Sequence, residues 1–263
     1  MTALVVAVGF SGLLVGSFLN VVVHRVPLGL SVVSPGSSCP ACGSPVRARD
    51  NVPVLSWVLL RGRCRDCRSP ISWRYPALEL GTAVVFACVA AVVGPTWALP
   101  AYLYLAAIAV ALALIDLDVR RLPDPIVLPS YAVTGVLLAV ASWGEDDWPA
   151  LLRAGLGGVS LFVLYVVLFV VKPGGMGLGD VKLAGVLGLY LGWWGWAALA
   201  VGGFAAFLLG GLAGCVLLAS GRAGRASRIP FGPYMLAGAL SALWVAAPVA
   251  DWYLALLGLD PPA

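Results

Sequence analysis

Residues 80–115 read LGTAVVFACVAAVVGPTWALPAYLYLAAIAVALALI, and these 36 positions include no Asp, Glu, Lys, Arg or His. A membrane-spanning helix needs about 20 mostly apolar residues, so this run is long enough for two spans. Gly94-Pro95 and Pro100 interrupt the run near its centre, where they favour a tight turn. The stretch therefore predicts a helical hairpin that crosses a membrane twice.

The rest of the chain continues this pattern. Of its 263 residues, 61% are hydrophobic and only 11% are charged, a balance far from that of a soluble domain. A second hairpin is expected over residues 183–220, with its turn at Gly192 to Trp196. The remaining uncharged runs, each long enough for one span, are residues 1–23, 125–144, 154–171 and 229–250. We predict an all-α polytopic membrane protein with about eight transmembrane helices.

The first run, residues 1–23, has the position and apolarity of a cleaved signal peptide. A signal peptide carries basic residues before its apolar core, whereas here none precede the run and His24-Arg25 follow it. We interpret it as a retained span with its N-terminus outside. Fifteen of the 16 Lys and Arg then lie inside, with Arg153 the exception. The net charge of +4 is thus explained by topology, with membrane lipid as partner and no need for nucleic acid.

The inside segments under this orientation are residues 24–79, 116–124, 172–182 and 221–228. The first of them contains two CxxC pairs, formed by Cys39, Cys42, Cys64 and Cys67. This spacing is typical of a tetrahedral four-thiolate zinc site, and a reducing cytosol disfavours disulfides. Two redox-active pairs or four free thiols are the alternative. Four protein ligands leave no open position on the metal, so we predict a structural zinc. Cys88 and Cys215 lie within apolar spans and are expected to be small packing residues.

An acidic residue beside a membrane span is a functional candidate because charges are costly there. Asp116 ends the long uncharged run, and Asp180 begins the sixth span after Gly177 and Gly179. The predicted topology places both carboxyls at the same cytoplasmic depth. Two carboxyls in a partly dehydrated site share a proton, so one activates water and the other polarises a carbonyl. This is the chemistry of an aspartic peptidase, and the two glycines permit close backbone approach.

Three other acidic residues receive plainer interpretations. Asp118 and Asp124 flank Arg120 and Arg121, and they are expected to be capping or solvated residues. Glu79 is expected to pair with an inside arginine.

Six elements of the sequence occur in the order found in a known family. They are residues 16–27 (GSFLNVVVHRVP), the CxxC pairs with residues 50–57 (DNVPVLSW) between them, 74–79 (RYPALE), 116–124 (DLDVRRLPD), 177–180 (GLGD) and 230–234 (PFGPY). The chain thereby resembles the type IV prepilin peptidases, also called leader peptidase and N-methyltransferase enzymes, over nearly its full length.

This resemblance implies a GxGD-type aspartic endopeptidase of the bacterial inner membrane, with Asp116 and Asp180 as the catalytic pair. Its substrates would be type IV prepilins or pseudopilins, cut at the cytoplasmic face. The resemblance also implies methylation of the new N-terminus with S-adenosylmethionine, although no Rossmann fingerprint supports this and the binding residues are unknown. The implied domains are a first helix (1–23), a cytoplasmic four-cysteine zinc-binding domain (24–79) and a peptidase domain of about seven helices (80–263).

Two other classes of function are compatible with a chain of this kind. A transporter or proton relay would use carboxylates near the middle of the bilayer, whereas these lie at its inner boundary. A non-catalytic assembly subunit would use the zinc domain for docking and would tolerate loss of either aspartate.

Overall fold

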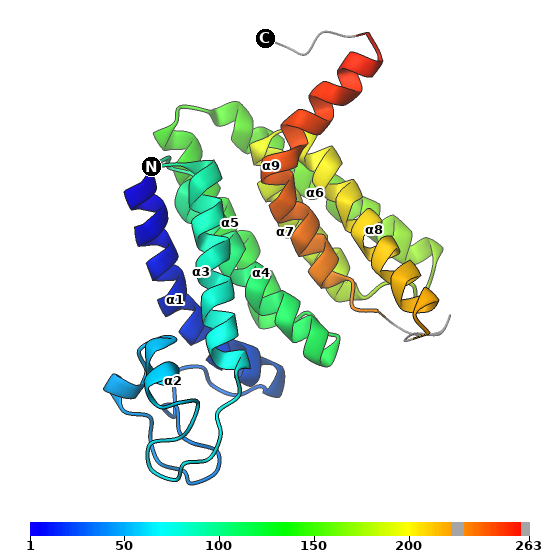
Figure 1. Cartoon of the computed structure of the whole chain (residues 1–263). Helices are drawn as coiled ribbons and strands as arrows, with labels where there is room; N and C mark the ends of the chain where they lie inside the picture. Colours follow the sequence, from blue (N-terminus) through cyan, green and yellow to red (C-terminus); the bar gives the residue numbers. More distant parts are fainter. Residues whose placement is uncertain (222–228, 259–263) are drawn as a thin grey trace. The chain divides into compact units, whose positions relative to one another are not determined.

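The computed structural model describes residues 1–221 and 229–258, and this part of the chain is built of α-helices without a β-strand (Figure 1). Among the described residues, seven helices are long and apolar enough to cross a membrane. They are α1 (Thr2–Arg25), α3 (Arg74–Val93), α4 (Leu99–Val119), α5 (Asp124–Gly144), α6 (Trp148–Val171), α8 (Trp196–Ala219) and α9 (Gly232–Leu256). One further long helix, α7 (Leu178–Trp194), has 17 residues and is not among these seven. The predicted all-α polytopic fold is confirmed.

The helix breaks lie where glycine and proline predicted them. Helix α3 ends at Val93 and α4 begins at Leu99 with Pro100 in its first turn. Helix α7 ends at Trp194 and α8 begins at Trp196, so that only Gly195 separates them. Its φ of 153° is a conformation that residues with a Cβ rarely adopt. Both predicted helix breaks are therefore confirmed.

The chain divides into two compact units, and the first comprises residues 1–95 and 102–111. Helices α1 and α3 lie side by side in it (Figure 1). A Cβ at Gly12 would lie 2.7 Å from the Cα of Ala83, and one at Gly16 would lie 2.8 Å from the Cα of Glu79. Small residues at this four-residue spacing let two helix backbones touch, which is a common way to pack helices in lipid.

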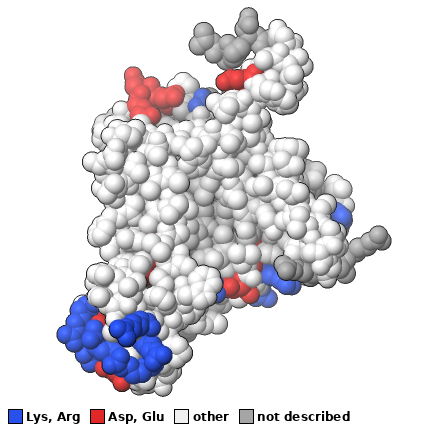
Figure 2. Space-filling view, in the orientation of Figure 1, with Lys and Arg blue, Asp and Glu red and all other residues white. Residues whose placement is uncertain are grey.

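The segment between α1 and α3 has little regular structure. It contains two short 3-10 helices, η1 (Val26–Leu28) and η2 (Ala48–Asp50), and the short helix α2 (Leu55–Leu59). Lys and Arg side chains gather over this loop (Figure 2). Three further arginines of the predicted inside set, at positions 222, 225 and 228, lie outside the described residues.

The second unit comprises residues 96–101 and 112–263, and α7 is its central helix. Helix α7 packs against α5, α6, α8 and α9, and 12 of its residues are buried. Its contact with α6 is made by glycines, because a Cβ at Gly157 would lie 2.6 Å from the carbonyl oxygen of Gly188. The two backbones therefore touch, and no larger residue fits between them.

Arg153, the exception to the predicted charge distribution, lies within α6, which begins at Trp148 and so earlier than expected. Its Nε and Nη2 atoms donate hydrogen bonds of 2.7 Å to the carbonyl oxygens of Gly192 and Trp193. These carbonyls belong to the last turn of α7, where backbone acceptors lack helical partners and a cation is favourable. Arg153 therefore caps the helix that carries Asp180 at its other end.

Cys88 and Cys215 do not pack as expected. Both side chains are exposed, on α3 and α8 respectively, so the prediction that they fill the interior is wrong. These helices are apolar all round, and their sequence therefore does not indicate which face is buried. A thiol is apolar enough to face lipid tails.

Candidate active site and metal centre

Asp116 lies in the last turn of α4 and is buried. Its Oδ2 atom accepts a hydrogen bond of 3.0 Å from the backbone N–H of Gly232, the first residue of α9. A Cβ at position 232 would lie 2.8 Å from the same oxygen, so only glycine allows this approach. Asp118, two residues further along, is exposed. The structure thus separates the two carboxyls of the Asp-Leu-Asp element.

Asp180 is the third residue of α7 and is also buried. Its Oδ2 atom accepts a hydrogen bond of 3.0 Å from the backbone N–H of Gly177, the residue that precedes the helix. Unpaired N–H groups at a helix N-terminus favour a carboxylate in this position. The GxGD element therefore holds its aspartate by local geometry.

Leu122 connects the surroundings of the two aspartates. A Cβ added at Gly179 would lie 2.9 Å from the Cβ of Leu122, and one at Gly232 would lie 3.2 Å from its Cδ2. The first glycine precedes Asp180 and the second binds Asp116, so the backbone segments beside both carboxyls meet at one buried leucine. Residues 64 positions apart in the chain are thus brought together within the second unit.

Three aromatic side chains pack beside these residues. The ring of Tyr165 on α6 lies 5.4 Å from that of Phe207 on α8 and 6.4 Å from that of Phe231, measured between centroids. Phe231 and Phe207 are 5.5 Å apart. Because Phe231 directly precedes Gly232, this cluster holds the start of α9 against α6 and α8.

The remaining acidic residues make other contacts. Asp124 begins α5, and both of its carboxylate oxygens accept hydrogen bonds from Nζ of Lys182, at 2.8 and 2.9 Å. Glu79, in the first unit, accepts a hydrogen bond of 2.7 Å from the backbone N–H of Val54. The sequence analysis expected an arginine as the partner of Glu79 and did not predict this contact with a backbone N–H. Val54 has a φ of 60°, which is unusual for a β-branched residue.

The four cysteines of the loop form one cluster in the first unit. The sulfur atoms of Cys39, Cys42, Cys64 and Cys67 all lie within 4.8 Å of one another. Two of them, of Cys39 and Cys67, are 3.8 Å apart. A tetrahedral zinc with Zn–S bonds of about 2.3 Å requires an S–S separation of roughly 3.8 Å. The donor set and its spacing therefore fit a four-thiolate zinc site.

The two halves of this cluster repeat one backbone arrangement. Each has the sequence Cys-x-x-Cys-x-Ser-Pro, in residues 39–45 and 64–70. In each, the N–H of the first cysteine donates to the serine carbonyl, at 2.9 Å. The residue after the second cysteine has a positive φ, 73° at Gly43 and 62° at Arg68. A glycine in the sequence indicates the positive φ at Gly43, but nothing in the sequence indicates the one at Arg68.

Hydrogen bonds favour the thiolate form of Cys39. The backbone N–H groups of Cys42 and Ala41, with the Ser69 hydroxyl, lower the pKa of Cys39 to about 6. The thiolate is the form that binds a metal. Zinc bound here would cross-link the two halves of the loop, because each half contributes two sulfur atoms.

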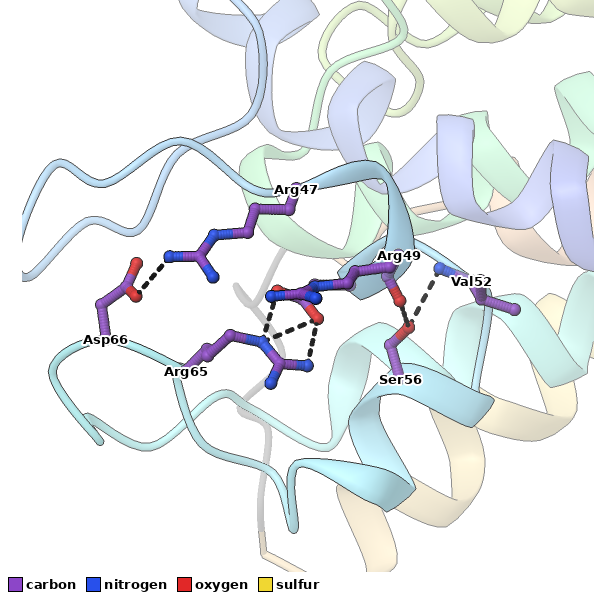
Figure 3. A network of polar contacts seen from close by, with 7 residues as sticks. Arg47, Arg49, Val52, Ser56, Arg65 and Asp66 are labelled. Carbon is purple, nitrogen blue, oxygen red and sulfur yellow. Dashed lines mark hydrogen bonds and ion pairs between the residues drawn. The ribbon is translucent and has the colours of Figure 1, made fainter.

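Ion pairs add a second set of links across the same loop (Figure 3). Arg47 donates to Asp66 at 3.0 Å, and Arg65 donates to both carboxylate oxygens of Asp50, at 2.6 to 3.0 Å. The Arg65 guanidinium lowers the pKa of Asp50. Both pairs join the segment before α2 to the second CxxC pair.

Two family models match the chain. The model described as the bacterial peptidase A24 N-terminal domain matches residues 10–93, and that of the type IV leader peptidase family matches residues 103–219. A prepilin leader peptidase/N-methyltransferase of Aeromonas hydrophila is 38% identical over 269 residues, covering 92% of this chain and 91% of the relative. The chain belongs to the type IV leader peptidase family.

Further relatives of the leader peptidase family carry the same name. The protein of Pseudomonas aeruginosa is 38% identical over 258 residues, covering 89% of this chain and 88% of the relative. That of Burkholderia pseudomallei is 36% identical over 277 residues, covering 94% and 86%. No solved structure matches the chain.

The candidate site includes residues to which the sequence analysis assigned no role. Gly232 lies beyond the matched residues 103–219, yet its amide binds Asp116. Gly232 belongs to the element PFGPY, residues 230–234, which marked it as part of the family pattern. The element did not indicate which residue Gly232 contacts. Leu122 lies in the quoted element of residues 116–124, which did not indicate its contacts, and Tyr165 had no signal because an aromatic residue near a span is ordinary.

Proposed function

We propose that this chain is a membrane aspartic endopeptidase that removes the leader from type IV prepilins or pseudopilins. The observation that carries the proposal is that two buried carboxyls from different helices, Asp116 and Asp180, each lie beside a glycine that packs against Leu122. The names of its relatives support the proposed substrate class.

The proposed chemistry needs one ionised and one protonated carboxyl. Asp116 and Asp180 each have one oxygen held by a backbone N–H, from Gly232 and Gly177, which fixes the orientation of the carboxyl planes. Two such groups in a buried site share one proton. The ionised group takes a proton from water, the resulting hydroxide attacks the scissile carbonyl, and the protonated group donates a hydrogen bond to the carbonyl oxygen. The two carboxyls titrate as a coupled pair, so the shared proton belongs to the pair and not to one aspartate.

Methylation of the new N-terminus is the second part of the proposal. It is supported by the name N-methyltransferase, which the relatives carry. S-adenosylmethionine would supply the methyl group, and we assign no residues to its binding. Zinc is proposed as a structural ion held by Cys39, Cys42, Cys64 and Cys67.

The proposed orientation has the N-terminus outside and both aspartates at the cytoplasmic face of the inner membrane. It is supported by the distribution of basic residues, since 15 of the 16 Lys and Arg fall in the segments predicted to lie inside. We also propose the division of labour expected from the sequence, with the zinc domain in residues 24–79 and the peptidase in residues 80–263.

The decisive experiment replaces Asp180 by Asn. Asparagine keeps an oxygen that accepts the hydrogen bond from Gly177 but cannot act as an acid or base, so the fold should persist. We expect cleavage of a purified prepilin to fall by at least roughly 1000-fold, with an unchanged amount of protein in the membrane. Gel electrophoresis and mass measurement of the substrate N-terminus report cleavage and methylation together.

Lys172→Gln is the matched control, because Lys172 is an exposed polar residue that follows α6. The Lys172→Gln variant should cleave the prepilin at the wild-type rate. If Asp180→Asn processed the substrate nearly as fast as wild type, the chain would not be an aspartic peptidase of this kind, and the docking role of an assembly subunit would explain it better.

A further inference from the structure

Two contacts from α5 converge on one residue of α7. Asp124, the first residue of α5, binds the ammonium of Lys182 through both carboxylate oxygens, at 2.8 and 2.9 Å. Tyr131, on the same helix, donates a hydrogen bond of 2.6 Å from its hydroxyl to the backbone carbonyl of Lys182. Positions seven apart lie on the same face of a helix, two turns from each other. One face of α5 therefore holds both the side chain and the backbone of residue 182.

The tyrosine contact depends on a glycine of α7. A Cβ at Gly185 would overlap the hydroxyl oxygen of Tyr131. The ring can therefore reach the backbone of α7 only because position 185 has no side chain. This second observation shows that the approach of α5 to the first turns of α7 is specific.

Residue 182 lies two positions after Asp180 in the same helical turn. A shift of α7 by one residue relative to α5 would rotate it by about 100° and move it by about 1.5 Å along its axis. Helix α5 follows directly on Leu122-Pro123, and Leu122 lies against the glycines beside both aspartates. A fixed register between α5 and α7 thus sets where Asp180 stands relative to Asp116.

We propose that Asp124, Tyr131 and Lys182 are positioning residues that hold Asp180 in register with Asp116 for peptide cleavage. The inference rests on the proposed peptidase function. The Asp124–Lys182 pair is partly exposed, with side-chain exposures of 52% and 34%, so it adds little stability by itself. Its effect is on geometry, because a small misplacement of a reacting group strongly slows catalysis.

The test measures steady-state cleavage of a purified prepilin by Lys182→Gln, Asp124→Asn and Tyr131→Phe. Each should lower kcat by roughly 10-fold and leave KM within roughly 2-fold of wild type, because substrate binding is retained while the reacting groups are displaced. Lys182→Arg keeps the charge and should recover most of the rate. Lys172→Gln and Tyr253→Phe are the controls, since each alters an exposed residue of the same type.

A double variant separates positioning from a general loss of structure. If Asp124 and Lys182 act through one pair, Asp124→Asn with Lys182→Gln should lose no more rate than either change alone. Wild-type kcat in all three single variants, or losses that multiply in the double variant, would overturn the proposal. If wild type itself cleaved no prepilin, the proposed function would fail instead, so the two failures are distinguishable.

Discussion

Asp116 and Asp118 are only two positions apart in the sequence, but their surroundings differ. Residues two apart on a helix point about 200° from each other, so both cannot face Asp180. Asp116 is buried with its oxygen bound to the Gly232 amide, whereas Asp118 is exposed. Burial therefore distinguishes the two carboxyls, and we propose Asp116 as the catalytic one.

We expect Asp116→Asn to abolish prepilin cleavage, because asparagine keeps an acceptor for Gly232 but not the ionisable proton. Asp118→Asn should retain a measurable part of the activity. The comparison is made by timed cleavage at matched amounts of membrane protein. The opposite ranking of the two variants would show that the catalytic carboxyl of this element is misassigned.

Arg68 provides a second prediction about a single residue. It has a φ of 62° at the position that Gly43 occupies in the other half of the cysteine cluster. Glycine relieves this strain, while a β-branched residue increases it. Arg68→Gly should therefore hold zinc as firmly as wild type, and Arg68→Val should release it at lower chelator concentration. Equal zinc retention by the two variants, measured by metal analysis after chelator titration, would contradict this account.

At the scale of whole helices, small residues determine how closely two helices pack. Glycines of α6 and α7 let their backbones touch, and Gly12 and Gly16 do the same for α1 against α3. These helices have no amphipathic stripe, because lipid and protein interior are both apolar. Backbone approach is therefore the main source of specificity between them.

Gly157→Ala tests this packing, with Gly155→Ala on the same helix as its control. A Cβ at Gly157 would lie 2.6 Å from the carbonyl oxygen of Gly188, whereas a Cβ at Gly155 meets nothing within 4 Å. We expect Gly157→Ala to destabilise the protein by about 1 to 3 kcal/mol and Gly155→Ala to leave stability unchanged or slightly raised. Thermal unfolding in detergent measures both, and equal transition temperatures would argue against the α6–α7 contact.

At the scale of the whole molecule, the cysteine cluster and the aspartates belong to different compact units. The cluster lies in the loop of the first unit, and both aspartates lie in the second. A structural metal would thus stabilise one part of the chain while the proposed chemistry takes place in the other.

Replacing Cys64 and Cys67 by Ser should release about one zinc per chain, because four thiolates hold a single ion. The loop should become more sensitive to protease, and cleavage of prepilin should weaken without vanishing, since no zinc ligand takes part in the proposed step. Metal analysis and limited proteolysis of the purified protein report these effects. Wild-type protein purified without chelators yet free of zinc would rule the site out.

The amino-acid sequence by itself determined the helical membrane class, both hairpin breaks and the four-cysteine cluster. These features depend on local properties: the length of an apolar run, a glycine or proline that ends a helix, and the spacing of ligands in a short loop. The same charge scarcity that predicted the spans also singled out Asp116 and Asp180. Counting spans predicted that the two carboxyls lie at the same depth.

Tertiary structure alone decided which side chains meet. It showed Gly232 as the donor to Asp116, Val54 as a partner of Glu79, and α5 as the helix that holds Lys182. It also showed that Cys88 and Cys215 face outward, contrary to expectation. A helix that is apolar on every side carries no record of its buried face, and a contact between residues more than 100 positions apart exists only once the helices have packed.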